Sequence, residues 1–195
     1  IWGGGTRPAG NSSASLVTIA DVDQVLIFNR RQVASHDPIS GKLIWTYPWT
    51  DGTQHVAQPL PVPGARLFVS TAYGTWGELI QIGKSDQGKF SATLICKNNL
   101  LKAKFANMAY RDGFVYGLDD GILVCLDPET GKRRWKRGRY GPGQLILVDD
   151  LLLITSEKGA VVLIEATPEK HNELARIEVF DHKTWNPPAL AAPYL

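Results

Sequence analysis

Cysteine is scarce in this sequence, which has only two among its 195 residues, Cys96 and Cys125. Two cysteines cannot supply the disulfide framework of a small secreted domain, and neither belongs to a Cys-x-x-Cys pair of the kind that binds zinc. The four histidines show no His-x-x-x-His spacing. We therefore predict no metal site, and we expect both thiols to be free and buried among apolar neighbours.

Long apolar runs and helical patterns are also missing. No stretch is long and apolar enough to predict a transmembrane helix, and none keeps apolar residues at helical spacing for three turns. The formal net charge of +2 is too small to indicate a nucleic-acid partner. No Gly-x-Ser-x-Gly elbow and no phosphate-binding glycine loop occurs, so we predict no catalytic residues.

One nine-residue pattern, Asp-Pro-x-Ser/Thr-Gly-Lys-x-x-Trp, is present twice. It runs from Asp37 to Trp45 and again from Asp127 to Trp135, a displacement of 127 − 37 = 90 positions. A fixed displacement is the signature of a repeat fold. Trp2 lies 45 − 2 = 43 positions before Trp45. The displacement therefore indicates two units of roughly 45 residues each.

Each unit has the pattern of short strands. Runs such as 24–28, 67–70, 114–117 and 151–154 are rich in β-branched and aromatic residues, and Gly, Asp, Asn and Pro separate them. Three or four antiparallel strands in such a repeat make one blade of a β-propeller. We predict an all-β fold with about four blades of four antiparallel strands. The chain, 1–195, is then one continuous partial propeller with units at 11–49, 54–97, 104–137 and 143–180, the tail of a preceding blade at 1–10 and the start of the next at 184–195.

The repeated pattern has a structural task in such a blade. Its proline presets φ and its glycine supplies positive φ in the turn between the two outer strands, while its aspartate caps the turn. Its tryptophan should lie on the outer strand, where the ring wedges between adjacent blades. We assign these structural docking roles to Asp37, Gly41, Trp45, Asp127, Gly131 and Trp135.

These residues resemble the tryptophan-docking motif of the PQQ-like (pyrroloquinoline quinone-like) propeller repeat family, close to Ala-x-Asp-x-x-Thr-Gly-x-x-x-Trp. Ser35 and Cys125 stand at the alanine position, Ser40 replaces threonine in the first copy, and the second and fourth units have no tryptophan. Segments 117–127 and 140–147 are similar to secreted bacterial members of this family, including the BamB-like propellers of the outer-membrane β-barrel assembly machine. The resemblance covers nearly the whole chain and implies the propeller fold.

The resemblance also implies a function class. It favours a non-enzymatic binding or scaffold propeller that contacts protein partners or a small ligand, needs no cofactor, and is periplasmic or extracellular. Closed propellers of this family usually have seven or eight blades, so we expect the chain to be a fragment or half of a larger ring. A half-ring exposes two blade faces, which favours a homodimer that closes the ring.

The alternative is a dehydrogenase that depends on PQQ and calcium. There the quinone oxidises the substrate, and the protein supplies a stacking surface, a calcium site and an aspartate base. Dehydrogenases of the family commonly have two adjacent cysteines beside the quinone, and this chain has no such pair. Nor does an acidic cluster indicate a calcium site. Saturable quenching of tryptophan fluorescence by PQQ and calcium, with turnover, would identify the enzyme.

Candidate contact residues follow from the register of the repeats. The segments that enter each innermost strand should line the central channel and its mouth. The candidates are Arg7, Asn11, His55, Asn107, Tyr140, Gln144, Trp185 and Asn186. Loop packing is the alternative for each of them, and Trp185 beside two prolines is expected to plug the hub.

Two further surface features stand out. Tyr73 and Trp76, in a glycine-punctuated stretch, are predicted to form an exposed aromatic patch for a peptide strand or a sugar. The basic run at 132–139 is interpreted either as a solvated blade edge or as a contact for an acidic partner or a membrane surface.

Overall fold

The computed structural model describes residues 2–3, 8–50, 54–73 and 75–191. In this part of the chain every regular element is a strand, and the sixteen strands form four separate four-stranded sheets. Blade 1 contains β1 (Ser15–Ile19), β2 (Val22–Asn29), β3 (Gln32–His36) and β4 (Leu43–Pro48). Blade 2 contains β5 (Leu60–Val62), β6 (Arg66–Ser70), β7 (Gly77–Lys84) and β8 (Phe90–Asn98).

Blade 3 contains β9 (Ala109–Arg111), β10 (Phe114–Asp119), β11 (Ile122–Asp127) and β12 (Lys132–Arg139). Blade 4 contains β13 (Gln144–Val148), β14 (Leu151–Thr155), β15 (Ala160–Glu165) and β16 (Glu173–Glu178). In each blade the strands pair in chain order and antiparallel. β12 continues to Arg139, beyond the end expected for the third unit at 137.

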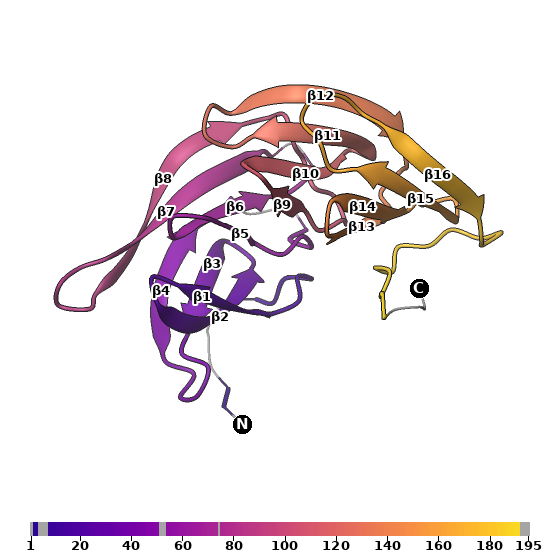
Figure 1. The fold of residues 1–195 in the computed structure, drawn as a ribbon. Coiled ribbons are helices and arrows are strands. Elements are labelled where there is room, and N and C mark those ends of the chain that lie inside the picture. Colours follow the sequence, from indigo (N-terminus) through magenta and orange to yellow (C-terminus); the bar gives the residue numbers. More distant parts are fainter. Residues whose placement is uncertain (1, 4–7, 51–53, 74, 192–195) are drawn as a thin grey trace.

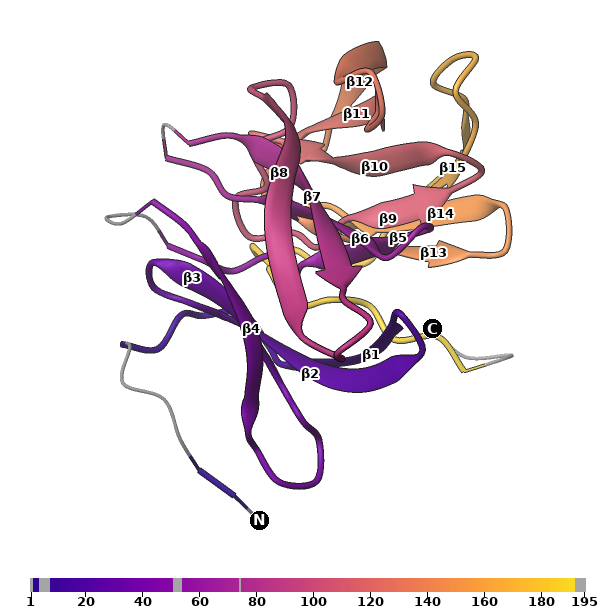
Figure 2. The ribbon, with the colours of Figure 1, turned by 90° about the vertical axis from the view of Figure 1, so that its left-hand side faces the viewer.

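The four blades are arranged as a β-propeller, which confirms the predicted fold class. Figure 1 shows them in order along an arc, with β4, β8, β12 and β16 on the outside, and Figure 2 shows the same blades from the side. Contacts between blades join β4 to β8, β5 to β9 and β9 to β13. No comparably extensive contact joins strands of blades 1 and 4 in the described part of the chain.

The hydrophobic core lies between the blades. Side chains alternate along each strand, so a blade with an apolar neighbour on both sides is apolar on both faces. In β6, Leu67 packs in the cluster shared with blade 1 and Phe68 packs in the cluster shared with blade 3, and both are fully buried. A third cluster joins blades 3 and 4. The near-continuous apolar runs of the middle strands follow from this two-sided burial.

The repeated pattern forms the turn between the two outer strands. The Oδ1 atom of Asp37 accepts the backbone N–H groups of Ile39 and Ser40 at 3.1 and 2.6 Å. Asp127 caps the equivalent turn in blade 3, where Oδ1 accepts two N–H groups at 2.9 and 3.2 Å. Gly41 and Gly131 have φ of 72° and 65°, a region in which a Cβ atom is strained. In both copies the aspartate caps the turn and the glycine lies at positive φ.

A register shift in each blade shows which outer-strand residues are equivalent. It follows directly after the pairs Ser35–Trp45, Leu79–Cys96, Cys125–Trp135 and Leu163–Ala175. Cys96 thus occupies in blade 2 the place of the tryptophans, and Ala175 occupies it in blade 4. Both cysteines are free, as expected, but only Cys125 is buried.

Two of these side chains, and also Trp2, donate a hydrogen bond to the next blade or its turn. Trp135 Nε1 donates to the carbonyl of Thr167 in blade 4 at 2.9 Å, and Cys96 Sγ donates to the carbonyl of Pro128 in blade 3 at 3.2 Å. Trp2 Nε1 donates in the same way to the carbonyl of Pro38 in blade 1 at 2.9 Å. Trp45 differs, because its Nε1 donates to Gln24 of its own blade at 2.8 Å.

Candidate functional site

The connections between blades gather at one end of the propeller, here called the hub end. Successive strands alternate in direction, so the segments that enter β5, β9 and β13 lie at the same end as the loops β6–β7 and β14–β15. The turns that carry the repeated pattern lie at the opposite end. Those predicted contact residues that the structure describes therefore belong to the hub end.

Three amide side chains link the blades at the hub end. Gln58 and Asn107 form a reciprocal pair, in which the Gln58 backbone N–H donates to Asn107 Oδ1 at 2.9 Å and Asn107 Nδ2 donates to Gln58 Oε1 at 3.0 Å. Gln144 Nε2 donates to the carbonyl of Phe105 at 2.6 Å, and Gln58 Nε2 reaches the carbonyl of Ser13 at 3.3 Å. These bonds join the segments before β1, β5 and β9 to one another and to the first residue of β13.

The amides line a small cavity of about 160 Å³. Of the predicted contact residues it brings together Asn11, Asn107 and Gln144, with Phe105 and Pro187 beside them. Because the amides of Asn107 and Gln144 are bonded to neighbouring segments, their main contribution is to the packing of the hub. Of these three predicted residues, Asn11 is exposed, Asn107 is half-buried and Gln144 is buried.

We expect Asn107→Ala to lower the free energy of unfolding by about 1–2 kcal/mol, because it removes both bonds of the reciprocal pair. Asn11→Ala, at the same cavity but exposed, is the control and should change the stability by less than about 0.5 kcal/mol. Chemical denaturation monitored by tryptophan fluorescence measures both. Equal stability of the two variants would contradict the structural role of the amide pair.

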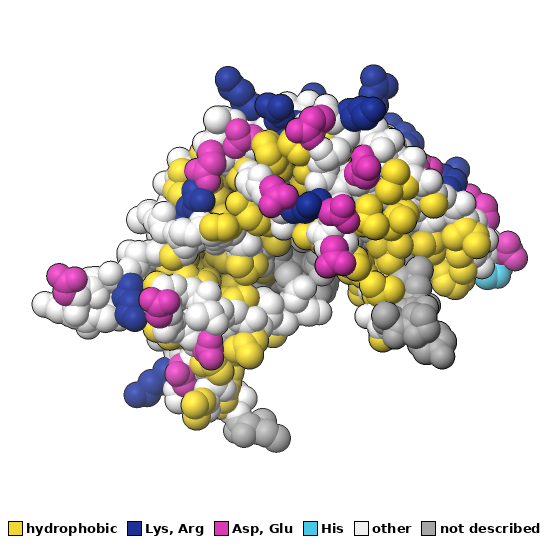
Figure 3. All heavy atoms as spheres, viewed as in Figure 1, with side chains coloured by type: hydrophobic (Ala, Val, Ile, Leu, Met, Phe, Trp, Pro, Cys, Tyr) yellow, Lys and Arg dark blue, Asp and Glu magenta, His cyan; other side chains and the backbone are white. Residues whose placement is uncertain are grey.

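The other predicted contact residues are placed differently. Arg7 lies outside the described residues. His55 is buried with its ring centroid 4.6 Å from that of Phe28, inside the packing between blades. Asn186 lines a separate apolar groove of about 540 Å³ along blade 4, with Val161, Ile177, Phe180 and two prolines. Figure 3 shows hydrophobic side chains gathered over blade 4.

The Tyr140 side chain packs between blades 3 and 4 and is only 2% exposed. Its hydroxyl lies 2.8 Å from His171 Nε2 and donates to Glu173 Oε2 at 2.9 Å. Burial, with the Glu173 carboxylate, raises the pKa of Tyr140, and burial lowers the pKa of His171. Arg176 holds Glu173 through two further hydrogen bonds. The cluster was not recognised in the sequence because its members are brought together only by blade packing.

A row of aromatic rings crosses the hub end and is here called the aromatic row: Tyr73, Phe105 and Trp185, with Lys104 beside the first two. Lys104 Nζ lies 5.2 Å from the Tyr73 ring centroid and 5.5 Å from that of Phe105. The centroids of Phe105 and Trp185 are 5.1 Å apart. Tyr73 is 50% exposed and Trp185 is 46% exposed. Blades 2, 3 and 4 thus contribute to one aromatic surface.

The structure differs from two predictions about aromatic residues, the hub plug at Trp185 and the exposed patch of Tyr73 with Trp76. Trp185 does not plug the hub, because its ring is half exposed and its Nε1 donates to Glu157 Oε1 at 3.0 Å. Trp76 does not share an exposed patch with Tyr73, because Trp76 donates to Glu78 at 2.6 Å and Lys97 Nζ lies 3.0 Å from its ring centroid. Lys104 and Phe105 lie in a segment, 104–107, that enters an innermost strand and was expected to line the channel mouth, but they were not among the predicted contact residues.

The described residues contain no group of three His, Cys, Asp or Glu side chains arranged to hold a metal ion. In the same part of the chain, no helix has the length and apolar character needed to cross a membrane.

The chain matches the family model described as outer membrane protein assembly factor BamB over residues 3–137. A search of curated proteins found no match. Among solved structures, the chain is similar to BamB from Moraxella catarrhalis, with a TM-score of 0.66 and 15% identity over 90% of this chain and 53% of that one. It is also similar to Saccharomyces cerevisiae Sqt1, with a TM-score of 0.63 and 9% identity over 93% of this chain and 53% of that one.

The chain spans about half the length of these two structures. At this level of identity the structural likeness shows the propeller fold alone, whereas the family match covers more than two thirds of the sequence. The repeated turns, the outer-strand tryptophans and the four antiparallel blades agree with that match. The chain therefore belongs to the family of the outer membrane protein assembly factor BamB.

Proposed function

We propose that this chain is a non-enzymatic scaffold propeller that binds another protein outside the cytoplasm through the aromatic row. The observation that carries the proposal is the exposure of Tyr73 and Trp185 on one continuous surface at the hub end. Exposed, ordered aromatic rings are typical anchors of protein contacts, because they bury a large area at little cost in side-chain entropy.

The geometry favours a polypeptide as the ligand. Lys104 lies near the rings of both Tyr73 and Phe105, which holds the rings in place and leaves an ammonium group for a carbonyl or a carboxylate of the partner. Lys183 Nζ lies 5.3 Å from the Trp185 ring centroid at the other end of the row. Because Lys183 is paired with Glu157 at 3.3 Å, the row suits an extended segment with apolar side chains and an acidic side chain placed near Lys104.

The family supports the location and the class of partner. BamB is described as an outer membrane protein assembly factor, which is consistent with a scaffold that acts on other proteins outside the cytoplasm. A second copy of the chain is a further proposed partner, since the chain covers about half of each matched structure and two copies would supply a whole ring. Light scattering after size-exclusion chromatography would show such a dimer as a doubled mass.

Site-specific crosslinking in the native host tests the proposal. A photoreactive phenylalanine at position 185 is expected to give a discrete adduct with a partner protein, and the same group at position 73 should give the same adduct. Ile39 is the control, because it is 91% exposed and lies at the opposite end of the propeller. The proposal fails if positions 185 and 39 give the same adducts, or if PQQ and calcium give saturable fluorescence quenching with alcohol oxidation.

A further inference from the structure

The outer strand of blade 3 differs from the outer strands of the other blades. β12 carries six basic residues and no acidic one. β4 carries no charged residue, β8 carries only Lys97, and β16 has a single arginine between two glutamates. Charges on an edge strand commonly prevent aggregation, but all four outer strands are edges. Protection therefore does not explain why the charge is concentrated in β12.

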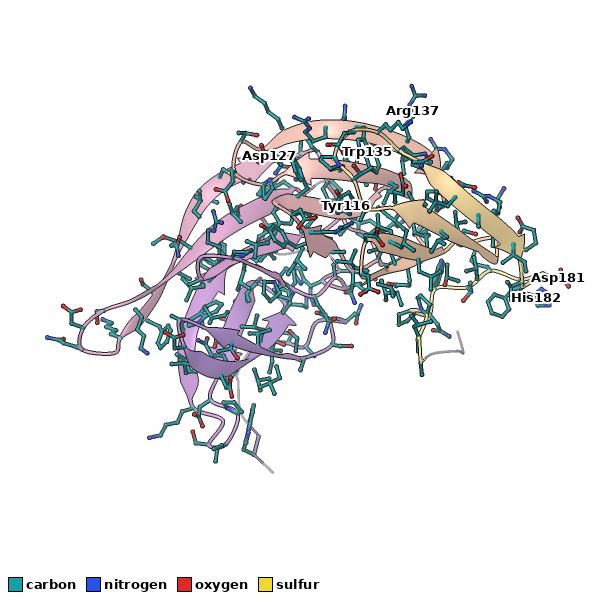
Figure 4. The ribbon with its side chains drawn as sticks, viewed as in Figure 1. Tyr116, Asp127, Trp135, Arg137, Asp181 and His182 are labelled. Carbon is teal, nitrogen blue, oxygen red and sulfur yellow. The ribbon has the colours of Figure 1, made fainter. Side chains whose placement is uncertain are left out.

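Most of this charge is available at the surface. Lys136 is paired with Asp119, and the Arg134 guanidinium lies 5.8 Å from the Phe114 ring centroid. The other four cations of β12 are exposed, and no salt bridge joins them to an acidic residue in the described part of the chain. They are Lys132, Arg133, Arg137 and Arg139. Figure 3 shows basic side chains along the crest of the molecule over β12, and Figure 4 shows Arg137 pointing away from the ribbon.

Three carboxylates near β12 are already engaged. Glu129, in the turn before β12, forms an ion pair with Arg66 of blade 2. Asp127 accepts the backbone N–H groups of its own turn, and Glu173 on β16 is held by Arg176. Lys132, Arg133 and Arg137 therefore face solvent without an ion pair in the described part of the chain, whereas Arg139 lines a cavity with Asp120, Glu157 and Glu178.

β12 also has a free backbone edge. It pairs with β11 on one side only, so the N–H and C=O groups of its other edge are open to a further strand. An eight-residue strand is roughly 26 Å long at about 3.3 Å per residue. The cations lie along this line, which fits an extended chain better than a flat lipid surface.

We propose that the free edge of β12 binds an extended acidic segment of another protein, which adds to blade 3 as a fifth strand. Backbone hydrogen bonds to the edge supply the register, and carboxylates of the segment pair with the exposed cations. This surface lies on the outer rim and is separate from the aromatic row at the hub end. The inference therefore goes beyond the proposed function and does not depend on it.

The test uses a ten-residue peptide of alternating glutamate and threonine, whose binding is measured by fluorescence anisotropy. A variant with Lys132, Arg133, Arg137 and Arg139 all changed to serine is expected to bind about tenfold more weakly, because each exposed pair contributes a few tenths of a kcal/mol. The matched control changes Lys42, Lys84, Lys89 and Lys170 to serine, which alters the net charge equally. Its affinity should fall by less than about twofold if the contact is local.

A second measurement tests the backbone contact. Peptide binding should slow hydrogen exchange at the amides of β12, and a peptide N-methylated at alternate residues should bind about tenfold more weakly, since its edge cannot pair. Equal loss of affinity in the two serine variants, or unchanged binding of the methylated peptide, would overturn the proposal. So would binding to phosphatidylglycerol vesicles that requires β12 while the peptide fails to bind. Trp185→Ser should leave peptide binding unchanged, which separates this surface from the aromatic row.

Discussion

Trp135→Ala is expected to lower the free energy of unfolding by about 3–5 kcal/mol, the range for removing a large buried aromatic side chain. Trp135 is 9% exposed and packs in the cluster between blades 3 and 4. Its ring centroid lies 6.2 Å from that of Tyr116 and 5.7 Å from that of His171. The ring therefore holds two blades together, and Figure 4 shows Trp135 near Tyr116 on the inner side of β12.

Two further variants separate the contribution of the buried ring from that of its hydrogen bond. Trp135→Phe keeps an aromatic ring but loses the bond to the Thr167 carbonyl, so it should cost about 1–2 kcal/mol. Trp185→Ala removes a half-exposed tryptophan and should cost less than about 1 kcal/mol. Equilibrium denaturation of the three variants gives the comparison. A loss below about 1 kcal/mol for Trp135→Ala would contradict the docking role.

Asp119→Ala is expected to lower the free energy of unfolding by about 3 kcal/mol, because it leaves two lysines without their shared buried partner. The Asp119 side chain is 2% exposed, and its carboxylate forms ion pairs with Lys102 at 2.9 Å and with Lys136. Oδ1 also accepts the Lys102 backbone N–H at 3.0 Å. One carboxylate thus ties the segment before β9 to the outer strand β12. The two lysines are partly exposed, so the effect should lie at the low end for a buried pair.

The same residue predicts a dependence on pH. Burial alone would raise the pKa of Asp119, but the hydrogen bonds from Lys136 and Lys102 outweigh it and hold the pKa below its ordinary value. A lowered folded-state pKa contributes stability above the unfolded value of about 3.9, and this stability is lost as the pH falls through the folded-state pKa. The stability difference between the wild type and Asp119→Asn should therefore shrink below about pH 4. A difference that is constant from pH 7 to pH 3 would contradict the ion-pair account.

The local features of the fold could be predicted from the sequence. The Asp-Pro-x-Ser/Thr-Gly-Lys pattern forms its turn through bonds from Asp37 to residues two and three positions later, and such contacts are encoded within a few residues. The near-continuous apolar runs specify strands that are buried on both faces. A repeat of about 45 residues with this pattern indicates one propeller blade.

The candidate site could be predicted only in part. The register placed Asn11, Asn107 and Gln144 together at the hub, because their segments enter equivalent strands. The register of the repeats does not predict which side chains surround Tyr140 and Trp185. Tyr140 is buried because β16 brings Glu173 over its hydroxyl, whereas Trp185 remains half exposed because it rests on Phe105 from another blade.

The sequence by itself therefore determined the repeat, the strands, the turns and the family. Only the tertiary structure decided which side chains meet between blades: the amide pair of Gln58 and Asn107, the aromatic row, and the place of Cys96 opposite Pro128. The physical reason is distance along the chain. Turns and alternation depend on neighbours a few residues apart, whereas each of these contacts joins residues more than thirty positions apart and depends on how two blades pack.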